Sequence, residues 1–150
     1  MANTFCKIYV QIVFSTRNRE NLISNDFREE LYKYIAGTII HRKSKPLAIG
    51  GTSNHIHIFC SLNPDIQLSY FVRDIKAASS KHINDSRLSN LKFEWQKGYA
   101  AFSYSESHID KVCKYVLNQQ EHHKTKTFED EYLSFIKAYK IDYNDSYVFQ

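Results

Sequence analysis

The first regular pattern along the chain is an alternation of apolar and polar residues between positions 6 and 15. Successive side chains of a strand point to opposite faces, so this alternation predicts a strand with one apolar face. That face carries Cys6, Ile8, Val10, Ile12 and Phe14. The polar segment TRNREN at 16–21 then interrupts the pattern and ends the predicted strand.

Two later segments have apolar residues spaced by three and four positions, the spacing of one face of an α-helix. The first helix is expected to start at Ser24 and the second near Pro64–Asp65. Their apolar faces contain Phe27, Leu31, Tyr34, Ile35, Thr38 and Ile39 in the first, and Leu68, Phe71, Val72, Ile75 and Ala78 in the second. Each helix therefore has one face that can pack against a sheet.

Three further strands are predicted in the segments KPLAIGGTSN (45–54, with a turn at its end), HIHIFCSL (55–62) and GYAAFSYS (98–105). The resulting order is β-α-β-β-α-β. This order predicts a ferredoxin-like α+β fold, an antiparallel sheet with both helices on one face.

Two more helices are predicted after the sheet. Ser107 with Asp110 and Thr127 with Asp130 resemble capping boxes in which Asp replaces Glu, and the first opens a helix near His108. The apolar stripe of the last helix is Phe128, Tyr132, Phe135, Ile136 and Tyr139. No segment is typical of a linker, so one domain is expected over 1–150, with a core at about 4–106 and a helical extension at about 107–150.

Composition narrows the class of protein. A chain of 150 residues with 43% hydrophobic residues suits one globular domain, and a net charge of +4 permits a polyanionic partner without establishing one. The three cysteines form no CxxC pair, which argues against a disulfide framework or a thiolate zinc site and favours a reducing compartment. No secretory signal or bilayer-spanning segment is found, so a cytoplasmic protein without a membrane partner is expected.

Candidate chemistry begins with His55 and His57, which lie one residue apart on a predicted strand. Both imidazoles point to the same face, opposite Ile56, and would lie on the open face if the two helices cover the other. Two such imidazoles can chelate one metal ion when another ligand completes the site. The alternative is a pair of solvent-facing strand residues.

The segment SHIDKVCKYVLNQQEHHK (107–124) is expected to be an amphipathic helix with the apolar stripe Ile109, Val112, Cys113, Val116 and Leu117. Tyr115 and Gln119 lie outside the stripe and four positions apart, so they are neighbours on one flank. A tyrosine hydroxyl can be a covalent nucleophile, and an amide oxygen can bind a hard divalent ion. The alternative is two surface residues. His122 and His123 could also be ligands, but adjacent helix residues do not easily face one site, so contact with phosphate, a partner or solvent is favoured.

Five segments, in this order, resemble one protein family: VFSTRNR, GGTSNHIHIF, IKAASSKHIN, WQKGYAAFSYSES and YVLNQQEHH. They are similar to the single-tyrosine HUH transposases of small bacterial insertion sequences and their repeat-associated relatives. The resemblance runs from about residue 5 to residue 149. Ala100 and Tyr104 depart from the family pattern, which puts only local strand packing or a DNA contact in doubt.

The resemblance implies a ferredoxin-like fold in which His55 and His57 are the HUH metal ligands, Gln119 is the third ligand and Tyr115 is the nucleophile. It implies Mg²⁺ or Mn²⁺ as the cofactor and no nucleotide cofactor. It also implies single-stranded DNA with hairpin ends as the substrate, cleaved and rejoined through a 5′-phosphotyrosine. Family members act as homodimers, in which the tyrosine helix of one subunit can complete the site of the other.

Candidate DNA contacts are Arg17 and Arg19 after the first strand, Arg73 and Lys76 on the second helix, and Trp95 before the last strand. Basic side chains meet phosphates, and an aromatic ring stacks on an unpaired base. The alternatives are solvated surface charges and, for Trp95, a packed core aromatic.

Two other functions compete with that of a mobile element's transposase. An RRM-like module with the same element order binds RNA on its sheet without chemistry and has no need of the histidine, tyrosine and glutamine set. A HUH nuclease that nicks without moving an element, such as a domesticated relative or a replication initiator, is the second. Replication initiators generally look different around the tyrosine, whereas a domesticated repeat-associated enzyme would keep the same residues. The sequence therefore does not separate a mobile enzyme from a domesticated one.

Overall fold

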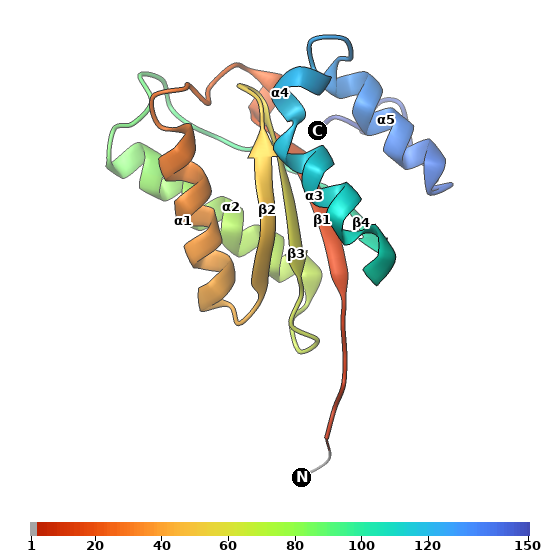
Figure 1. Ribbon diagram of the computed structural model, residues 1–150. Coiled ribbons are helices and arrows are strands. Elements are labelled where there is room, and N and C mark those ends of the chain that lie inside the picture. The colour runs from red at the N-terminus through yellow and green to blue at the C-terminus, as the bar shows by residue number, and fades with distance from the viewer. Residues whose placement is uncertain (1–2) are drawn as a thin grey trace.

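A four-stranded sheet lies between two layers of helices in the computed structural model, which describes residues 3–150 (Figure 1). The strands are β1 (Tyr9–Ser15), β2 (Lys45–Gly51), β3 (His55–Ser61) and β4 (Ala100–Tyr104). Every pairing is antiparallel and the strand order is β2-β3-β1-β4. This order, with one helix in each of the two crossovers, confirms the predicted ferredoxin-like α+β fold.

Helices α1 (Arg28–His41) and α2 (Leu68–Asp85) pack on one face of the sheet (Figure 1). The apolar sides of β1 and β3 meet them there, with Ile12, Phe14, Ile56, Ile58 and Cys60 in one core cluster. The predicted apolar face of the first strand is thus largely confirmed. The strand begins at Tyr9, however, so Cys6 precedes it and is exposed.

The opposite face of the sheet is covered by α3 (Ile109–Leu117), α4 (Gln119–His122) and α5 (Phe128–Ala138) (Figure 1). Val112 and Val116 of α3 pack on Phe59, and Phe128 of α5 belongs to a third apolar cluster with Phe102 of β4. The histidines of β3 are on this face, so the expectation that they lie on an open face is wrong. The C-terminal helices bury them.

Gly50 lets α3 approach the edge strand β2 closely. A Cβ atom built at this position would overlap the carbonyl oxygen of Val116 in α3. Glycine is the one residue type without that atom, and it therefore sets how near α3 can lie to the sheet. The positions of the α3 side chains beside Val116, including Tyr115, therefore depend on this contact.

Two helices start later than their apolar stripes predict. A turn at 25–27 precedes α1, and α2 begins after the turn at 64–65. The predicted cap at Ser107 is also wrong, because this residue lies in the short 3-10 helix η2 (Glu106–His108) and its hydroxyl bonds with Ser105 and His108. The predicted cap at Thr127 is confirmed: its hydroxyl accepts from the Asp130 N–H at 3.1 Å.

The segment predicted as one helix over 108–124 is interrupted at Asn118, which has non-helical backbone angles (φ −102°, ψ 23°). The break separates α3 from α4. Leu117, expected on the apolar stripe, is 66% exposed, whereas Gln119 just beyond the break is buried. Within residues 3–150, none of the helices combines the length and apolar character that crossing a bilayer requires.

Candidate functional site

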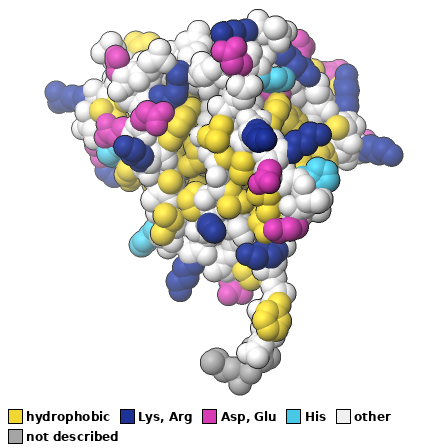
Figure 2. Space-filling view, in the orientation of Figure 1, with side chains coloured by type: hydrophobic (Ala, Val, Ile, Leu, Met, Phe, Trp, Pro, Cys, Tyr) yellow, Lys and Arg dark blue, Asp and Glu magenta, His cyan; other side chains and the backbone are white. Residues whose placement is uncertain are grey.

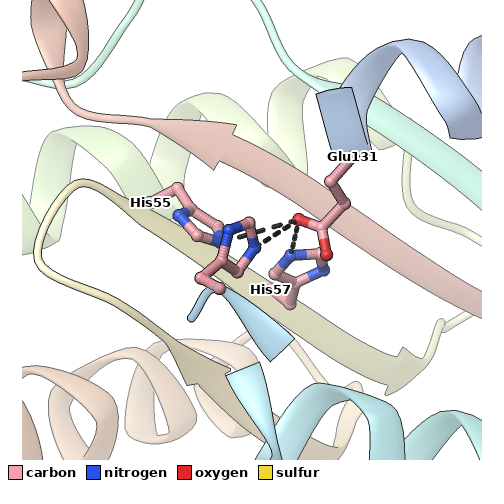
Figure 3. Close-up of side chains that lie close together, drawn as sticks. His55, His57 and Glu131 are labelled. Carbon is pink, nitrogen blue, oxygen red and sulfur yellow. Dashed lines mark hydrogen bonds and ion pairs between the residues drawn. The ribbon is translucent and has the colours of Figure 1, made fainter. Parts of the chain in front are cut away.

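His55 and His57 form the floor of a buried polar cluster on β3. Both side chains are 0% exposed, and their rings lie 5.2 Å apart between centroids. The strand is central, paired with β1 and β2, so its backbone holds the two rings in fixed register. The predicted common face of the pair is confirmed, and it points toward α3, α4 and α5 (Figure 3).

Neighbouring polar groups orient both rings. The Gln11 amide donates to the Tyr104 hydroxyl at 2.9 Å, which leaves the Gln11 Oε1 to accept from His57 Nδ1 at 2.7 Å. On the other ring, the Asn54 Oδ1 accepts from His55 Nδ1 at 2.9 Å. In each histidine the Nε2 atom is therefore the one turned toward the C-terminal helices. Partners of this kind fix the tautomer of metal-binding histidines.

His55 is held neutral by its surroundings. Burial is the main cause, and with the neighbouring His57 it lowers the pKa of His55 from 6.5 to about 3. In the neutral ring, Nδ1–H donates to Asn54 and the Nε2 lone pair stays free. This is the state in which an imidazole binds a metal ion.

Gln119 is brought to the same point by the break before α4. Its side chain is 1% exposed, and its amide donates to the backbone carbonyl of Tyr115 at 3.2 Å. The amide oxygen therefore faces inward, 3.2 Å from His55 Nε2. The structure places this side chain where the sequence analysis expects a third ligand.

Tyr115 reaches the cluster from α3 of the same chain. Its ring centroid is 5.8 Å from that of His57, and its hydroxyl donates to Glu131 Oε2 and lies 3.3 Å from His122 Nε2. Burial, and then the hydrogen bond to Glu131, raise the pKa of Tyr115 well above its ordinary value. The histidine pair and the tyrosine are thus assembled within one subunit.

Glu131 of α5 is a site residue that the sequence analysis missed. Its side chain is 1% exposed, and its Oε1 lies 2.9 Å from His57 Nε2, 3.0 Å from His123 Nε2 and 3.6 Å from His55 Nε2 (Figure 3). Burial acts to raise the pKa of Glu131, but the contacts with His123 and His57 outweigh it and hold this pKa below its ordinary range. The sequence does contain a signal for this residue. Glu131 lies three positions after Phe128, so it is a charged side chain on the predicted apolar stripe of the last helix, and a buried charge needs a partner.

His122 and His123 both join the cluster, contrary to the expectation that they face phosphate, a partner or solvent. His123 Nε2 contacts Glu131 Oε1, whereas His122 Nε2 lies 3.2 Å from Oε2. Adjacent residues near the end of a helix point in different directions. They can nevertheless meet one carboxylate because each ring approaches a different oxygen.

The cluster suits a metal ion. One ligand atom from each of His55, His57, His123 and Glu131 lies within 4.8 Å of the other three. Imidazole nitrogens and a carboxylate oxygen are ordinary ligands of divalent ions, and burial excludes competing water. The donor set and the two oriented rings therefore fit the metal that the sequence analysis expects.

Tyr115 borders an open groove between α3 and α5. The groove has a volume of about 410 Å³ and is lined by apolar, aromatic and basic side chains, including Tyr104, Lys111, Tyr115, Lys126 and Phe135. Tyr104, which departs from the family pattern, thus contributes to both the groove and the support of Gln11. A nucleotide in this groove would lie beside the Tyr115 hydroxyl.

The predicted DNA-contact residues are not brought to this groove. Arg17, Arg73, Lys76 and Trp95 line a cavity of about 760 Å³ beside α2, on the other side of the sheet. Arg19 instead forms an ion pair with Glu129 at 2.7 Å.

Two of these candidates have structural partners. Trp95 is 9% exposed, packs edge-on against Phe14 and Phe93, and donates from its indole N–H to Ser79 at 2.9 Å. It is therefore the packed core aromatic, the alternative to base stacking. The Lys76 ammonium donates to the carbonyls of Gln96 at 2.9 Å and Gly98 at 2.6 Å, while burial lowers its pKa to about 8.

The fold and the site together define a class of protein, a ferredoxin-like domain whose sheet carries a buried histidine pair faced by a tyrosine. Comparison with family models makes this specific. The family described as "Transposase IS200 like" matches residues 4–119, and the chain belongs to this family. The match includes His55, His57, Tyr115 and Gln119 and ends before His123 and Glu131.

Two solved structures have a similar fold. A protein from Deinococcus radiodurans R1 assigned as a transposase has 15% identity and a TM-score of 0.63, covering 79% of this chain and 95% of that one. A REP-associated tyrosine transposase bound to a REP hairpin has 18% identity and a TM-score of 0.57, covering 77% of this chain and 68% of that one. A search of curated proteins gave no match.

Proposed function

We propose that this transposase cuts and rejoins single-stranded DNA through a covalent 5′-phosphotyrosine on Tyr115. The observation that carries the proposal is the convergence, within one chain, of the Tyr115 hydroxyl with the buried His55 and His57 pair. Family membership supports a reaction on DNA. The groove beside Tyr115 offers aromatic and basic side chains for one nucleotide and its phosphate.

The proposed reaction conserves the phosphodiester bond. The Tyr115 oxygen attacks phosphorus while the bond from phosphorus to the 3′ oxygen breaks, and the proton lost by tyrosine ends on that 3′ oxygen. A free 3′-hydroxyl then attacks the phosphotyrosine, forms a new phosphodiester and returns a proton to Tyr115. Because no bond energy is spent, the reaction needs no nucleotide cofactor.

His55, His57 and Gln119 are proposed to hold Mg²⁺ or Mn²⁺ beside the tyrosine. When bound, such an ion stabilises negative charge on a phosphate oxygen. The protein itself orients the reacting groups. Strand β3 holds the two imidazoles in place, and Gly50 lets α3, which carries the nucleophile, approach the sheet closely. The reacting groups are thereby held in one geometry before DNA binds.

The Tyr115 hydroxyl must also leave Glu131 before its oxygen can attack phosphorus. The hydrogen bond to Glu131 and partial burial keep the Tyr115 hydroxyl protonated. DNA entering the groove is proposed to draw the hydroxyl away from this carboxylate and toward phosphorus. Lys111 and Lys126 at the groove are suited to pair with the flanking phosphates.

Single-stranded DNA with hairpin ends is the proposed substrate, since one structural neighbour is bound to a REP hairpin. The exposed side chains of Arg17 and Arg73, on the α2 side, are proposed to contact its phosphates. A homodimer is also proposed. Figure 2 shows hydrophobic side chains in the middle of one face of the molecule. The same view in Figure 1 has the edge strand β2 on this face. An edge strand with apolar surface around it can pair with a second copy of the chain.

An RNA-binding module of the RRM type is less consistent with the structure. Such a module stacks bases on an open sheet face. Here α1 and α2 cover one face and α3, α4 and α5 the other, and the histidines on the second face have no exposed surface.

The test is incubation with single-stranded oligonucleotides from the flanks of the gene, with Mg²⁺, Mn²⁺ or EDTA, followed by a denaturing gel. We expect a covalent protein–DNA band that requires metal and is lost in Tyr115→Phe. The matched control is Tyr70→Phe, which removes an exposed hydroxyl on α2 and should leave the band unchanged. Binding to many such oligonucleotides without any covalent band would contradict the proposal.

A further inference from the structure

Two side chains outside the family match enter the histidine site. The match ends at residue 119, whereas His123 follows α4 and Glu131 is carried by α5. Neither side chain is at the surface: His123 is mostly buried and Glu131 fully so. The segment that carries them is thus part of the site and not only a cover over the sheet.

The donor atoms of this segment meet those of β3 at one point. The Glu131 Oε1 atom lies within 3.0 Å of the Nε2 atoms of both His57 and His123. One ligand atom from each of these residues and from His55 lies within 4.8 Å of the others. The Gln119 amide oxygen is 3.2 Å from His55 Nε2 and borders the same point.

A positive charge between the histidine Nε2 atoms and Glu131 Oε1 is electrostatically favoured. A carboxylate only accepts hydrogen bonds, and the Nδ1 protons of His55 and His57 are already directed to Asn54 and Gln11. Several protonated imidazoles packed around one carboxylate would repel each other. One divalent cation, in contrast, binds every Nε2 lone pair and the carboxylate oxygen together.

We propose that His123 and Glu131 are ligands of the same metal ion as His55 and His57, and that this set of three imidazoles and one carboxylate makes the site prefer Mn²⁺ to Mg²⁺. The inference rests on the proposed function, which supplies the metal at the histidine pair. Mg²⁺ favours oxygen ligands and retains water, whereas imidazole binds first-row transition ions more strongly.

The arrangement also links the metal to the nucleophile. Glu131 Oε1 faces the three imidazoles, whereas Oε2 accepts the hydrogen bond from Tyr115. A single carboxylate therefore contacts both functional parts of the site. With respect to the tyrosine, Glu131 is a positioning residue.

The experiment measures metal affinity directly. Mn²⁺ binding to the full chain is followed by the loss of the free-ion EPR signal, and Mg²⁺ is measured by competition. We expect Mn²⁺ to bind at least about tenfold more tightly than Mg²⁺. Glu131→Gln and His123→Asn should each weaken Mn²⁺ binding by about tenfold or more, since even outer-shell partners contribute 10–100-fold. Matched controls are Glu129→Gln on the same helix, whose side chain is 40% exposed, and His41→Asn on α1, which is exposed; both should bind as the wild type does.

A second measurement on the wild type does not depend on how the variants fold. Pulsed EPR of bound Mn²⁺ should detect three coupled imidazole nitrogens, and only two would overturn the assignment of His123. Unchanged Mn²⁺ affinity in Glu131→Gln and His123→Asn, with loss in His57→Asn, overturns this inference but leaves the proposed function standing. Absence of Mn²⁺ binding to the wild type overturns the inference, and absence of the covalent DNA band as well overturns both.

Discussion

At the residue scale, the site depends on side chains that orient its histidines. Gln11 is fully buried on β1 and holds His57 through Nδ1 while it donates to Tyr104. Gln11→Leu keeps the volume but leaves the His57 N–H and the Tyr104 hydroxyl without these partners. We expect metal affinity to fall by about 10–100-fold and the free energy of unfolding to fall by about 1–3 kcal/mol.

Metal titration and urea unfolding measure these two effects. The control is Gln67→Leu, which changes an exposed glutamine just before α2 and should alter neither quantity. Full metal affinity in Gln11→Leu would show that the orientation of His57 does not depend on this hydrogen bond.

Sequence reasoning found the residues that have a local pattern and missed those that do not. His55 and His57 share a strand face by alternation alone, and Tyr115 with Gln119 follow helix spacing. Glu131 could be recognised only as a charge on an apolar stripe, because its partners on β3, His55 and His57, are more than seventy positions away along the chain. The inward turn of His123 follows from the end of α4, which the single predicted helix concealed.

At the element scale, one glycine determines where α3 lies. Gly50→Ala would place a methyl group against the Val116 carbonyl, which belongs to backbone and cannot rotate away. We expect the substitution to lower the free energy of unfolding by about 1–3 kcal/mol, the usual cost of overpacking, and to reduce formation of the tyrosine–DNA adduct. Urea unfolding and the gel assay measure the two effects.

The matched control is Gly37→Ala in α1, where an added Cβ has no neighbour within 4 Å. This change should raise the free energy of unfolding by about 0.5–1 kcal/mol, since alanine favours the helix. Equal effects of the two substitutions would refute the close approach of α3 to β2.

The break between α3 and α4 shows why element boundaries are hard to predict. The apolar stripe ends at Leu117, and the polar residues 118–124 that follow contain no glycine or proline to mark the end of the helix. The tertiary structure favours a break, because it lets the Gln119 side chain turn from the flank of the helix into the buried cluster. Local pattern therefore identified the helix, whereas long-range packing determined its end.

At the scale of the whole molecule, the order of strands and helices was predictable and the covering of the second sheet face was not. Alternation and helical spacing are local, and together they restrict the topology to the ferredoxin-like arrangement. Where α5 packs depends on the apolar cluster that Phe128 and Tyr132 form with Val13 of β1, more than a hundred positions earlier, and with Phe102 of β4. These contacts bury the histidines and convert an expected open face into a closed site.

This closure predicts that metal should fasten the C-terminal extension to the sheet. If His123 and Glu131 bind the same ion as His55 and His57, then Mn²⁺ connects α4 and α5 to β3. Mn²⁺ at about one hundred times its dissociation constant should stabilise the fold by about 2.7 kcal/mol, by mass action. EDTA should reverse the effect.

Hydrogen exchange locates this stabilisation. Added Mn²⁺ should slow exchange in residues 119–138 as well as in β3, because opening of α4 or α5 would then require loss of the metal. In Glu131→Gln the slowing should become much weaker over α5 and persist at β3, whereas Glu129→Gln should behave as the wild type does. Slowing confined to β3 in the wild type would mean that the extension covers the site without binding its metal. Slowing that extends over α5 would instead make the C-terminal helices a metal-dependent part of the catalytic unit.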